Sequence, residues 1–441
     1  MIEPLYHGVF SATLESGLRI LVEEVPSSRS ASVGLWINAG SRDDPQSAPG
    51  SAHFLEHLMF KGTPSRDAVT ISREIDALGG HLNGVTGKES TCYYADLPGD
   101  SLPTAIEILA DLVQHPTFDP AELELERGVV LEEIRGHDDD PEQYAYALFT
   151  AGLWHGLYPN GASPNRADTN RADTNGAHPL SRSVLGDKST IESVTRTQLI
   201  EHHSHLYRPD KMVLAVCGAV NAAAVIELAG DLFTPSPHPP TPVARSRPHL
   251  KSGRCHHERK TAQTHVYLAL PGADAQDEDR FAHAVVNTIF GGGMSSRLFR
   301  LIREERGLAY AVLSSSIHYS DAGFWLIYAG VAPKNAAETV DLVLSQVDRL
   351  QQKGITPDEL SLAKAKLRGN LILDLESNSN RMSRLGGAAI AEREILSPDT
   401  LIARLDAVSE DDTRRVIARF ADADRANLAV VGPATVMDTD A

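Results

Sequence analysis

The sequence is poor in cysteine, in long apolar runs and in targeting features. Its three cysteines, Cys92, Cys217 and Cys255, are odd in number and far apart, which argues against a disulfide framework and fits reduced thiols. Cys217 lies in the apolar stretch VLAVCGAV and is expected to be a small buried side chain. No apolar run approaches the roughly 20 residues that span a bilayer, and MIEPLYHGVF has no basic segment followed by an apolar one. These absences predict a cytoplasmic protein with no membrane partner.

Positive charge is also scarce. The 441 residues contain 41 Lys and Arg against 59 Asp and Glu, a formal net charge of −18. This balance argues against nucleic acid or an anionic membrane surface as the main partner, although it permits attraction of basic ligands. With 42% hydrophobic and 23% charged residues the composition is that of a globular protein. The length predicts two or three domains.

The two halves of the chain have similar patterns of strands and helices. The segment 233–254 holds six prolines and almost no apolar periodicity, so it is interpreted as a linker. Before it, strand patterns at 17–25, 31–40, 81–86, 90–98 and 211–218 alternate with helical patterns, and similar strands at 264–270, 309–318, 322–331 and 426–432 follow it. Both halves end in a similar apolar segment, LAVCG at 214–218 and LAVVG at 428–432. We predict an α+β fold of two tandem homologous domains, 1–232 and 255–441, joined by the linker 233–254.

Two local features carry no predicted chemistry. NRADT occurs at 165–169 and again at 170–174 within a polar Gly/Pro-containing stretch, which is typical of a surface loop expanded by tandem duplication; a binding role is the alternative. HHSH at 202–205 ends a helical stretch without an evident inward carboxylate, and it is interpreted as a solvated helix end rather than a metal site.

The stretch SAHFLEHLMFKGT at 51–63 places His53, Glu56 and His57 within five residues. A helix turns about 100° per residue, so the two histidines share one face and Glu56 lies on the same side. Two imidazoles at this spacing can bind one Zn²⁺ while the glutamate contacts a bound water. PGSA at 49–52 and Gly62 mark the expected helix ends. The five residues alone are equally compatible with histidines satisfied by hydrogen bonds.

A third ligand is expected on a predicted helix at 119–141. Leu123, Glu126, Val129, Val130 and Glu133 form one stripe of it, and the valines predict that the stripe faces inward. Carboxylates on a buried face need a cation or hydrogen-bond donors. We therefore predict Glu133 as the third ligand, Glu126 as a helper carboxylate, and Glu132 as a solvated side chain.

These motifs resemble the pitrilysin/insulinase clan of inverted-zincin peptidases, especially its bacterial branch similar to the mitochondrial processing peptidase. The matching segments span both halves: HFLEHLMFKGT at 53–63, LGGHLNGVTGKESTCYY at 78–94, ERGVVLEEI at 126–134, and GGGMSSRLFRLIREERGLAYAV at 291–312. The resemblance implies a zinc-dependent metalloendopeptidase with one Zn²⁺ per chain, held by His53, His57 and Glu133. It also implies that Glu56 is the general base and Glu126 the helper.

The same resemblance implies further features. Arg303 and Tyr310 match positions that contact the peptide near its scissile bond, where the alternatives are a solvated helix position and an ordinary strand-core residue. Asn83 matches a residue near an edge strand to which the peptide adds. Relatives close around their substrates as pairs of chains, so a homodimer or a heterodimer with a related subunit, acting on unfolded peptides, is expected. A non-catalytic structural or partner-activating subunit is the rival; it predicts a missing ligand or base, and none is missing.

The second half offers an internal control. If Phe60 is matched to Phe290, then His53, Glu56 and His57 fall opposite His283, Val286 and Asn287. On this alignment only the first half does chemistry, and the second contributes binding surface.

Overall fold

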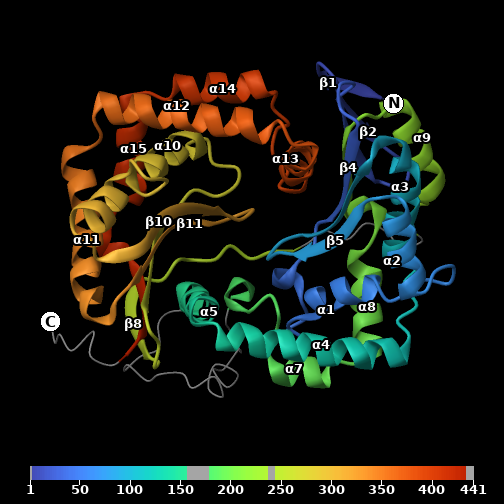
Figure 1. The fold of residues 1–441 in the computed structure, drawn as a ribbon, viewed down its shortest axis with the longest axis horizontal. Helices are drawn as coiled ribbons and strands as arrows, with labels where there is room; N and C mark the ends of the chain where they lie inside the picture. Colours follow the sequence, from blue (N-terminus) through green and yellow to red (C-terminus); the bar gives the residue numbers. More distant parts are fainter. Residues whose placement is uncertain (1, 156–177, 237–243, 434–441) are drawn as a thin grey trace. The chain divides into compact units, whose positions relative to one another are not determined.

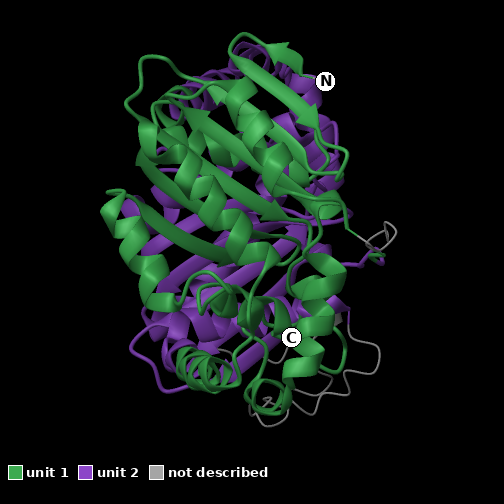
Figure 2. Ribbon diagram, turned by 90° about the vertical axis from the view of Figure 1, so that its right-hand side faces the viewer, with its two compact units in different colours: residues 1–134, 182–245, 372–397 green, residues 135–181, 246–371, 398–441 purple. Residues whose placement is uncertain are grey.

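The computed structural model describes residues 2–155, 178–236 and 244–433. The chain divides into two compact units, and neither is continuous in sequence (Figure 2). Unit 1 comprises residues 1–134, 182–245 and 372–397, and unit 2 comprises residues 135–181, 246–371 and 398–441. No helix in the described residues combines the length and apolar character needed to cross a membrane. Both copies of NRADT, and residues 237–243 of the predicted linker, lie outside the described residues.

Unit 1 is built on a seven-stranded sheet in the order β1-β2-β3-β7-β4-β6-β5 (Figure 1). Its strands are β1 (Glu3–Tyr6), β2 (Val9–Thr13), β3 (Arg19–Glu24), β4 (Ser30–Ile37), β5 (His81–Thr86), β6 (Thr91–Pro98) and β7 (Met212–Gly218). Its helices are α1 (Ser51–Met59), α2 (Ala68–Ala77), α3 (Leu102–Gln114), the first part of α4 (Pro120–Asp139), α7 (Lys188–Ser193), α8 (Arg196–Leu206), α9 (Ala222–Leu232) and α13 (Asn378–Ile390). Every pairing is antiparallel except that of β3 with β7.

Unit 2 is built on a five-stranded sheet in the order β10-β11-β9-β12-β8. Its strands are β8 (Gly253–Glu258), β9 (Thr264–Pro271), β10 (Ala309–His318), β11 (Gly323–Val331) and β12 (Asn427–Gly432). Its helices are α5 (Pro141–His155), α10 (Arg280–Phe290), α11 (Ala336–Lys353), most of α12 (Pro357–Asp374), α14 (Pro398–Ala407), α15 (Glu410–Phe420) and a π-helical segment, Phe299–Glu305.

The two sheets repeat one arrangement, as the sequence predicted. In unit 1, β3-β7-β4-β6-β5 has the same order as β8-β12-β9-β11-β10 in unit 2, and the one parallel pair is β3 with β7 or β8 with β12. The predicted α+β class with two homologous domains is therefore confirmed. The periodicity did not reveal β1, β2 or β8. β8 begins inside the predicted linker. Its polar sequence GRCHHE is compatible with an edge strand, which pairs with a single neighbouring strand.

Each sheet is covered on one face by a helix from the other half of the sequence. α13 packs on β4 and β7 of unit 1, where Met382, Leu385 and Ala389 join an apolar cluster with Leu21 and Ala215. α5 packs on β9 and β12 of unit 2 through a stripe at helical spacing, Ala145, Phe149 and Leu153. This exchange makes both units discontinuous in sequence.

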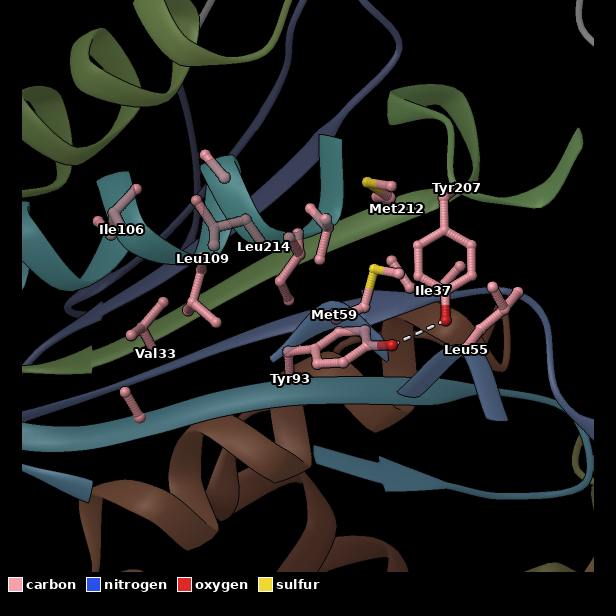
Figure 3. Packing of buried hydrophobic residues seen from close by; sticks show 14 of the residues in the cluster. Val33, Ile37, Leu55, Met59, Tyr93, Ile106, Leu109, Tyr207, Met212 and Leu214 are labelled. Carbon is pink, nitrogen blue, oxygen red and sulfur yellow. Dashed lines mark hydrogen bonds between the residues drawn. The ribbon is translucent and has the colours of Figure 1, made fainter. Parts of the chain in front are cut away.

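The opposite face of the unit 1 sheet carries the main core and supports α1. Leu55 and Met59 of α1 are buried against strand residues such as Ile37 and Tyr93 (Figure 3). The Tyr93 hydroxyl would be costly to bury alone, and it hydrogen-bonds the Tyr207 hydroxyl at 2.8 Å. α1 is thus fixed along its apolar side, so its polar side has a defined position.

Candidate metal centre

The start of α1 is held by a carboxylate from an earlier loop. Gly50, at φ 91°, precedes the first helical residue, as predicted for the 49–52 region, and has no side chain to cap the helix. Asp44 takes that role, because its carboxylate accepts hydrogen bonds from the Gly50 N–H at 2.7 Å and the Ala52 N–H at 2.8 Å. Burial raises the pKa of Asp44 above its ordinary value, although these bonds and nearby His202 oppose the rise. No local pattern in α1 indicates this cap, because Asp44 lies outside the helix.

His53 and His57 point to one carboxylate oxygen on α4. Their Nε2 atoms each lie 3.5 Å from Glu133 Oε2. The three ligand atoms lie within 4.8 Å of one another, and this is the one such group of three or more His, Cys, Asp or Glu in the described residues. Burial, together with the charge of His57, lowers the pKa of His53 to about 4, so the ring is neutral at physiological pH. A neutral ring keeps a lone pair for an ion.

Glu126 contacts the metal-site helix directly. Its Oε2 lies 2.9 Å from His57 Nδ1, and its Oε1 lies 2.6 Å from Lys61 Nζ. A carboxylate at Nδ1 favours the tautomer whose proton is on Nδ1 and whose lone pair is on Nε2, toward Glu133. Burial opposes charge on His57, but the bonds with Glu133 and Glu126 outweigh it and raise its pKa.

Glu56 lies in a tight polar niche between α1 and β5. Its carboxylate accepts a hydrogen bond from the Thr86 hydroxyl. A Cβ at Gly84 would lie 2.8 Å from Glu56 Cγ, so the absence of a side chain there lets β5 approach this closely. Burial raises the pKa of Glu56 above its ordinary value, and the Thr86 bond and the His57 charge only partly offset the rise.

The stripe predicted on α4 is only partly correct. Leu123, Glu126 and Val130 are buried, whereas Val129 is 49% exposed and the Glu133 side chain is 46% exposed. The predicted inward orientation of Val129 is wrong. Val129 is 100° around the helix from Val130 and lies outside the contact with the rest of unit 1. Glu133 stands at the rim of the buried face. Glu132 is exposed, as predicted.

The other predicted residues fall in two places. Asn83 is exposed on β5, an edge strand of the unit 1 sheet. Arg303 and Tyr310 meet in unit 2, where the Arg303 guanidinium carbon lies 5.6 Å from the Tyr310 ring centre and 4.9 Å from that of Phe299. Tyr310 is 77% exposed on the edge strand β10, so the strand-core alternative is wrong.

The interpretation of HHSH as a solvated helix end is wrong for its first two histidines. His202 is buried, with Nε2 3.4 Å from Asp44 Oδ1. His203 Nε2 lies 2.8 Å from the Val113 carbonyl oxygen, and burial lowers its pKa to about 4. The carboxylate partner of His202 is Asp44, which is distant in sequence, so the local spacing around 202–205 does not predict the pair.

Among the described residues, those of the matching helix α10 in unit 2 belong to no such group of ligand atoms. His283 is fully buried among Trp325, Phe420 and His318, and burial lowers its pKa to about 3. The side-chain oxygen of Asn287 accepts hydrogen bonds from Ser314 at 2.7 Å and from the Trp325 indole at 2.8 Å. The side-chain oxygen of Asn287 is therefore used within the core, whereas the His283 ring is enclosed by aromatic side chains.

Comparisons with known proteins point to one family. The family model described as Insulinase (Peptidase family M16) matches residues 19–156, and the model described as Peptidase M16 inactive domain matches residues 193–367. An uncharacterized zinc protease of Streptomyces coelicolor is 37% identical over 97% of this chain and 91% of its own length. The beta subunit of the mitochondrial-processing peptidase of Lentinula edodes is 30% identical over 93% of this chain and 86% of its own length.

A solved structure from Pseudomonas fluorescens, described as a peptidase M16 inactive domain, superposes with a TM-score of 0.86 at 22% identity. It covers 98% of this chain and 100% of the other. That likeness establishes the fold, and the sequence matches over both halves confirm the resemblance read from the motifs. The chain belongs to peptidase family M16.

Proposed function

We propose that this protein is a zinc metalloendopeptidase that hydrolyses unfolded peptides or short extended segments. The observation that carries the proposal is the convergence of His53 and His57 on one oxygen of Glu133, with the half-buried Glu56 on the same helix. The family membership and the zinc-protease names of the relatives support it.

The residues present fit a zinc ion. Ligand distances of about 2.0–2.1 Å in a tetrahedron place neighbouring ligand atoms roughly 3.3–3.4 Å apart, and the two nitrogen-to-oxygen separations are 3.5 Å. Two imidazoles and one carboxylate are a ligand set typical of catalytic zinc, with a fourth position left for water. His53, His57 and Glu133 would hold one ion per chain, which would act as a Lewis acid on water and on the scissile carbonyl.

Glu56 is the proposed general base. Its raised pKa suits a group that takes a proton from the attacking water and then gives it to the leaving amine. The Thr86 hydroxyl and the close backbone at Gly84 hold the carboxylate in one orientation. Glu126 orients the His57 ring through Nδ1.

The edge strand β5 is the proposed docking strand for the peptide. It pairs with β6 on one side only, and it contacts Glu56 through Thr86. An extended peptide can add to such an edge by main-chain hydrogen bonds, with Asn83 beside it. Arg303 and Tyr310, stacked and exposed in unit 2, are proposed to contact the bound peptide.

We further propose that the protein acts in the cytoplasm as a homodimer or as a heterodimer with a related subunit, as the word subunit in the name of the fungal relative suggests. The alternative, a non-catalytic partner-activating subunit, is disfavoured because the base and all three ligands are present in one cluster.

The test compares wild type with Glu56→Gln on a quenched peptide library, with and without chelator, and measures zinc content. The proposal predicts chelator-sensitive cleavage by wild type, and zinc retention without cleavage by Glu56→Gln. Equal cleavage by both proteins would remove Glu56 as the base. Wild-type protein without bound zinc and without activity would overturn the whole proposal.

A further inference from the structure

Beyond the proposed base and ligands, one cation lies next to the centre. Lys61 follows α1 in the turn after Phe60, and its Nζ lies 2.6 Å from Glu126 Oε1. The other oxygen of the same carboxylate, Oε2, lies 2.9 Å from His57 Nδ1. Glu126 thus joins an ammonium group to an imidazole, with one oxygen for each.

The backbone that carries Lys61 is held on both sides. The Lys61 N–H donates to the Leu58 carbonyl at 3.1 Å, and the Gly62 carbonyl accepts from the N–H and the hydroxyl of Thr117 at 3.0 and 3.1 Å. Two residues on, the Thr63 hydroxyl donates to the Asp111 carboxylate at 2.8 Å. The ammonium group therefore reaches Glu126 from a turn that is fixed independently of the metal ligands.

The ion pair is partly shielded from water. The Glu126 side chain is 8% exposed and that of Lys61 is 29% exposed. Within the described residues, Glu126 is the one acidic side chain that pairs with Lys61. A carboxylate this buried needs donors to its oxygens, and Lys61 supplies the donor to Oε1. The second oxygen of this carboxylate faces His57 Nδ1 and so orients the ring with Nε2 toward Glu133.

We propose that Lys61 is a positioning residue of the metal centre: it holds the Glu126 carboxylate in place, and through Glu126 it sets the orientation and tautomer of the His57 ring. The inference rests on the metal-binding part of the proposed function.

The sign of the effect separates this role from simple proximity. A lysine that merely lay near the ion would repel it, and its removal would strengthen zinc binding. A lysine that supports Glu126 does the opposite. We expect Lys61→Met to weaken zinc binding about tenfold, at the lower end of the effect of removing an outer partner of a ligand. Lys61→Arg keeps the charge and should stay within about threefold of wild type.

The experiment measures zinc affinity by chelator competition for wild type, Lys61→Met, Lys61→Gln and Lys61→Arg. Lys61→Gln serves as a second loss variant in case Lys61→Met folds poorly, which circular dichroism of the metal-free protein would show. Lys188→Met is the matched control, because Lys188 also faces a glutamate, Glu192 at 3.7 Å, but both side chains are at least half exposed. Weaker binding by Met and Gln, with wild-type binding by Arg and by the control, supports the proposal.

A double-mutant cycle tests the route through Glu126. In a Glu126→Gln background, Lys61→Met should cause no further loss of zinc affinity, whereas a second tenfold loss would overturn the proposal. Nitrogen NMR of histidine-labelled metal-free protein, at a pH where the rings are neutral, should show His57 protonated on Nδ1 in wild type and a mixture of tautomers in Lys61→Met.

Unchanged or tighter zinc binding by Lys61→Met and Lys61→Gln would also overturn the role of Lys61. Failure of wild-type protein to bind zinc at all would instead remove the proposed function itself, so the two failures are distinguishable.

Discussion

Helix α1 of unit 1 and helix α10 of unit 2 occupy equivalent positions against sheets of the same strand order. They differ in the side chains that could bind a metal ion. Where α1 carries Glu56 and His57, α10 carries Val286 and Asn287. The second helix of each site differs in the same way. When Pro120 of α4 is matched to Pro357 of α12, Glu126 and Glu133 fall opposite Ala363 and Asn370.

The difference shows how far the surroundings decide what a histidine does. His57 has carboxylates at both ring nitrogens, and its pKa is raised. His283, buried among aromatic rings, has no hydrogen-bond partner on either nitrogen within the described residues, and burial lowers its pKa to about 3. The backbone scaffold is shared, and the chemistry depends on a few side chains placed on it.

The largest expected effect comes from making unit 1 resemble unit 2 at one residue. His57→Asn installs the amide found at 287, removes one of three ligands, and leaves Glu126 without its imidazole partner. We expect loss of bound zinc and at least about a thousandfold loss of peptidase activity. Metal analysis by mass spectrometry and a peptide-cleavage assay would measure both.

His115→Asn is the matched control for this change. His115 is an exposed histidine of unit 1, 3.5 Å from the Asp111 carboxylate, and its replacement should alter neither quantity. A His57→Asn protein that kept one zinc per chain would show that the ion binds elsewhere.

The reverse exchange should damage stability rather than activity. Val286→Glu places a carboxylate at a position with no exposed surface, whereas Glu56 is supported by Thr86. We expect a loss of about 3 kcal/mol or more in the free energy of unfolding, since an unpaired buried charge is among the costliest substitutions. Val69→Glu on α2, where the valine is 65% exposed, should change it by less than about 0.5 kcal/mol. Equal urea midpoints for the two variants would contradict this.

The parts of this comparison that sequence reasoning could predict are local ones. Alternating apolar residues predicted the five strands of each repeat except β8, and the i, i+4 spacing of His53 and His57 placed both on one face. These features depend on residues close in sequence, where the periods of 2 and 3.6 hold.

What it could not predict depends on distant contacts. The N-terminal cap of α1 comes from Asp44, which in turn contacts His202. Helix α13 packs on the sheet that contains β7, although it begins 160 residues after β7 ends. No pattern within α13 indicates which sheet it covers. The stripe on α4 failed for a related reason, because the width of a buried face is set by the neighbour and not by the helix itself.

An intermediate effect is expected at the cap that positions α1. Asp44→Ala removes the acceptor of two N–H groups and should cost about 2 kcal/mol of unfolding free energy, since buried donors are left unpaired. Zinc affinity should fall as well, because His53 lies in the first turn of α1. The control is Asp67→Ala, which removes the exposed cap of α2 at Thr70 and should cost about 1 kcal/mol. The interpretation fails if the Asp67 variant weakens zinc binding as much as the Asp44 variant.

The smallest effect is a change in the pH dependence of stability, measured on metal-free protein. The pKa of His283 is about 3 in the folded state against an ordinary value of 6.5. Between these values the unfolded chain binds a proton at this site that the folded chain does not, so stability is lost as pH falls from about 6.5 toward 3. One such proton gives a slope of at most about 1.4 kcal/mol per pH unit.

His283→Leu removes this contribution, and the expected result is a shallower fall in urea midpoint between pH 6.5 and 4.5. His57, whose pKa is raised, has the opposite sign and a higher pH window: its contribution is complete below about pH 6.5 and is lost as pH rises above that value. His57→Leu should therefore reduce the loss of stability above pH 6.5 and leave the slope between pH 6.5 and 4.5 nearly unchanged. If His57→Leu makes the fall between pH 6.5 and 4.5 shallower, as His283→Leu does, the contrast between the two helices does not arise from the surroundings of their histidines.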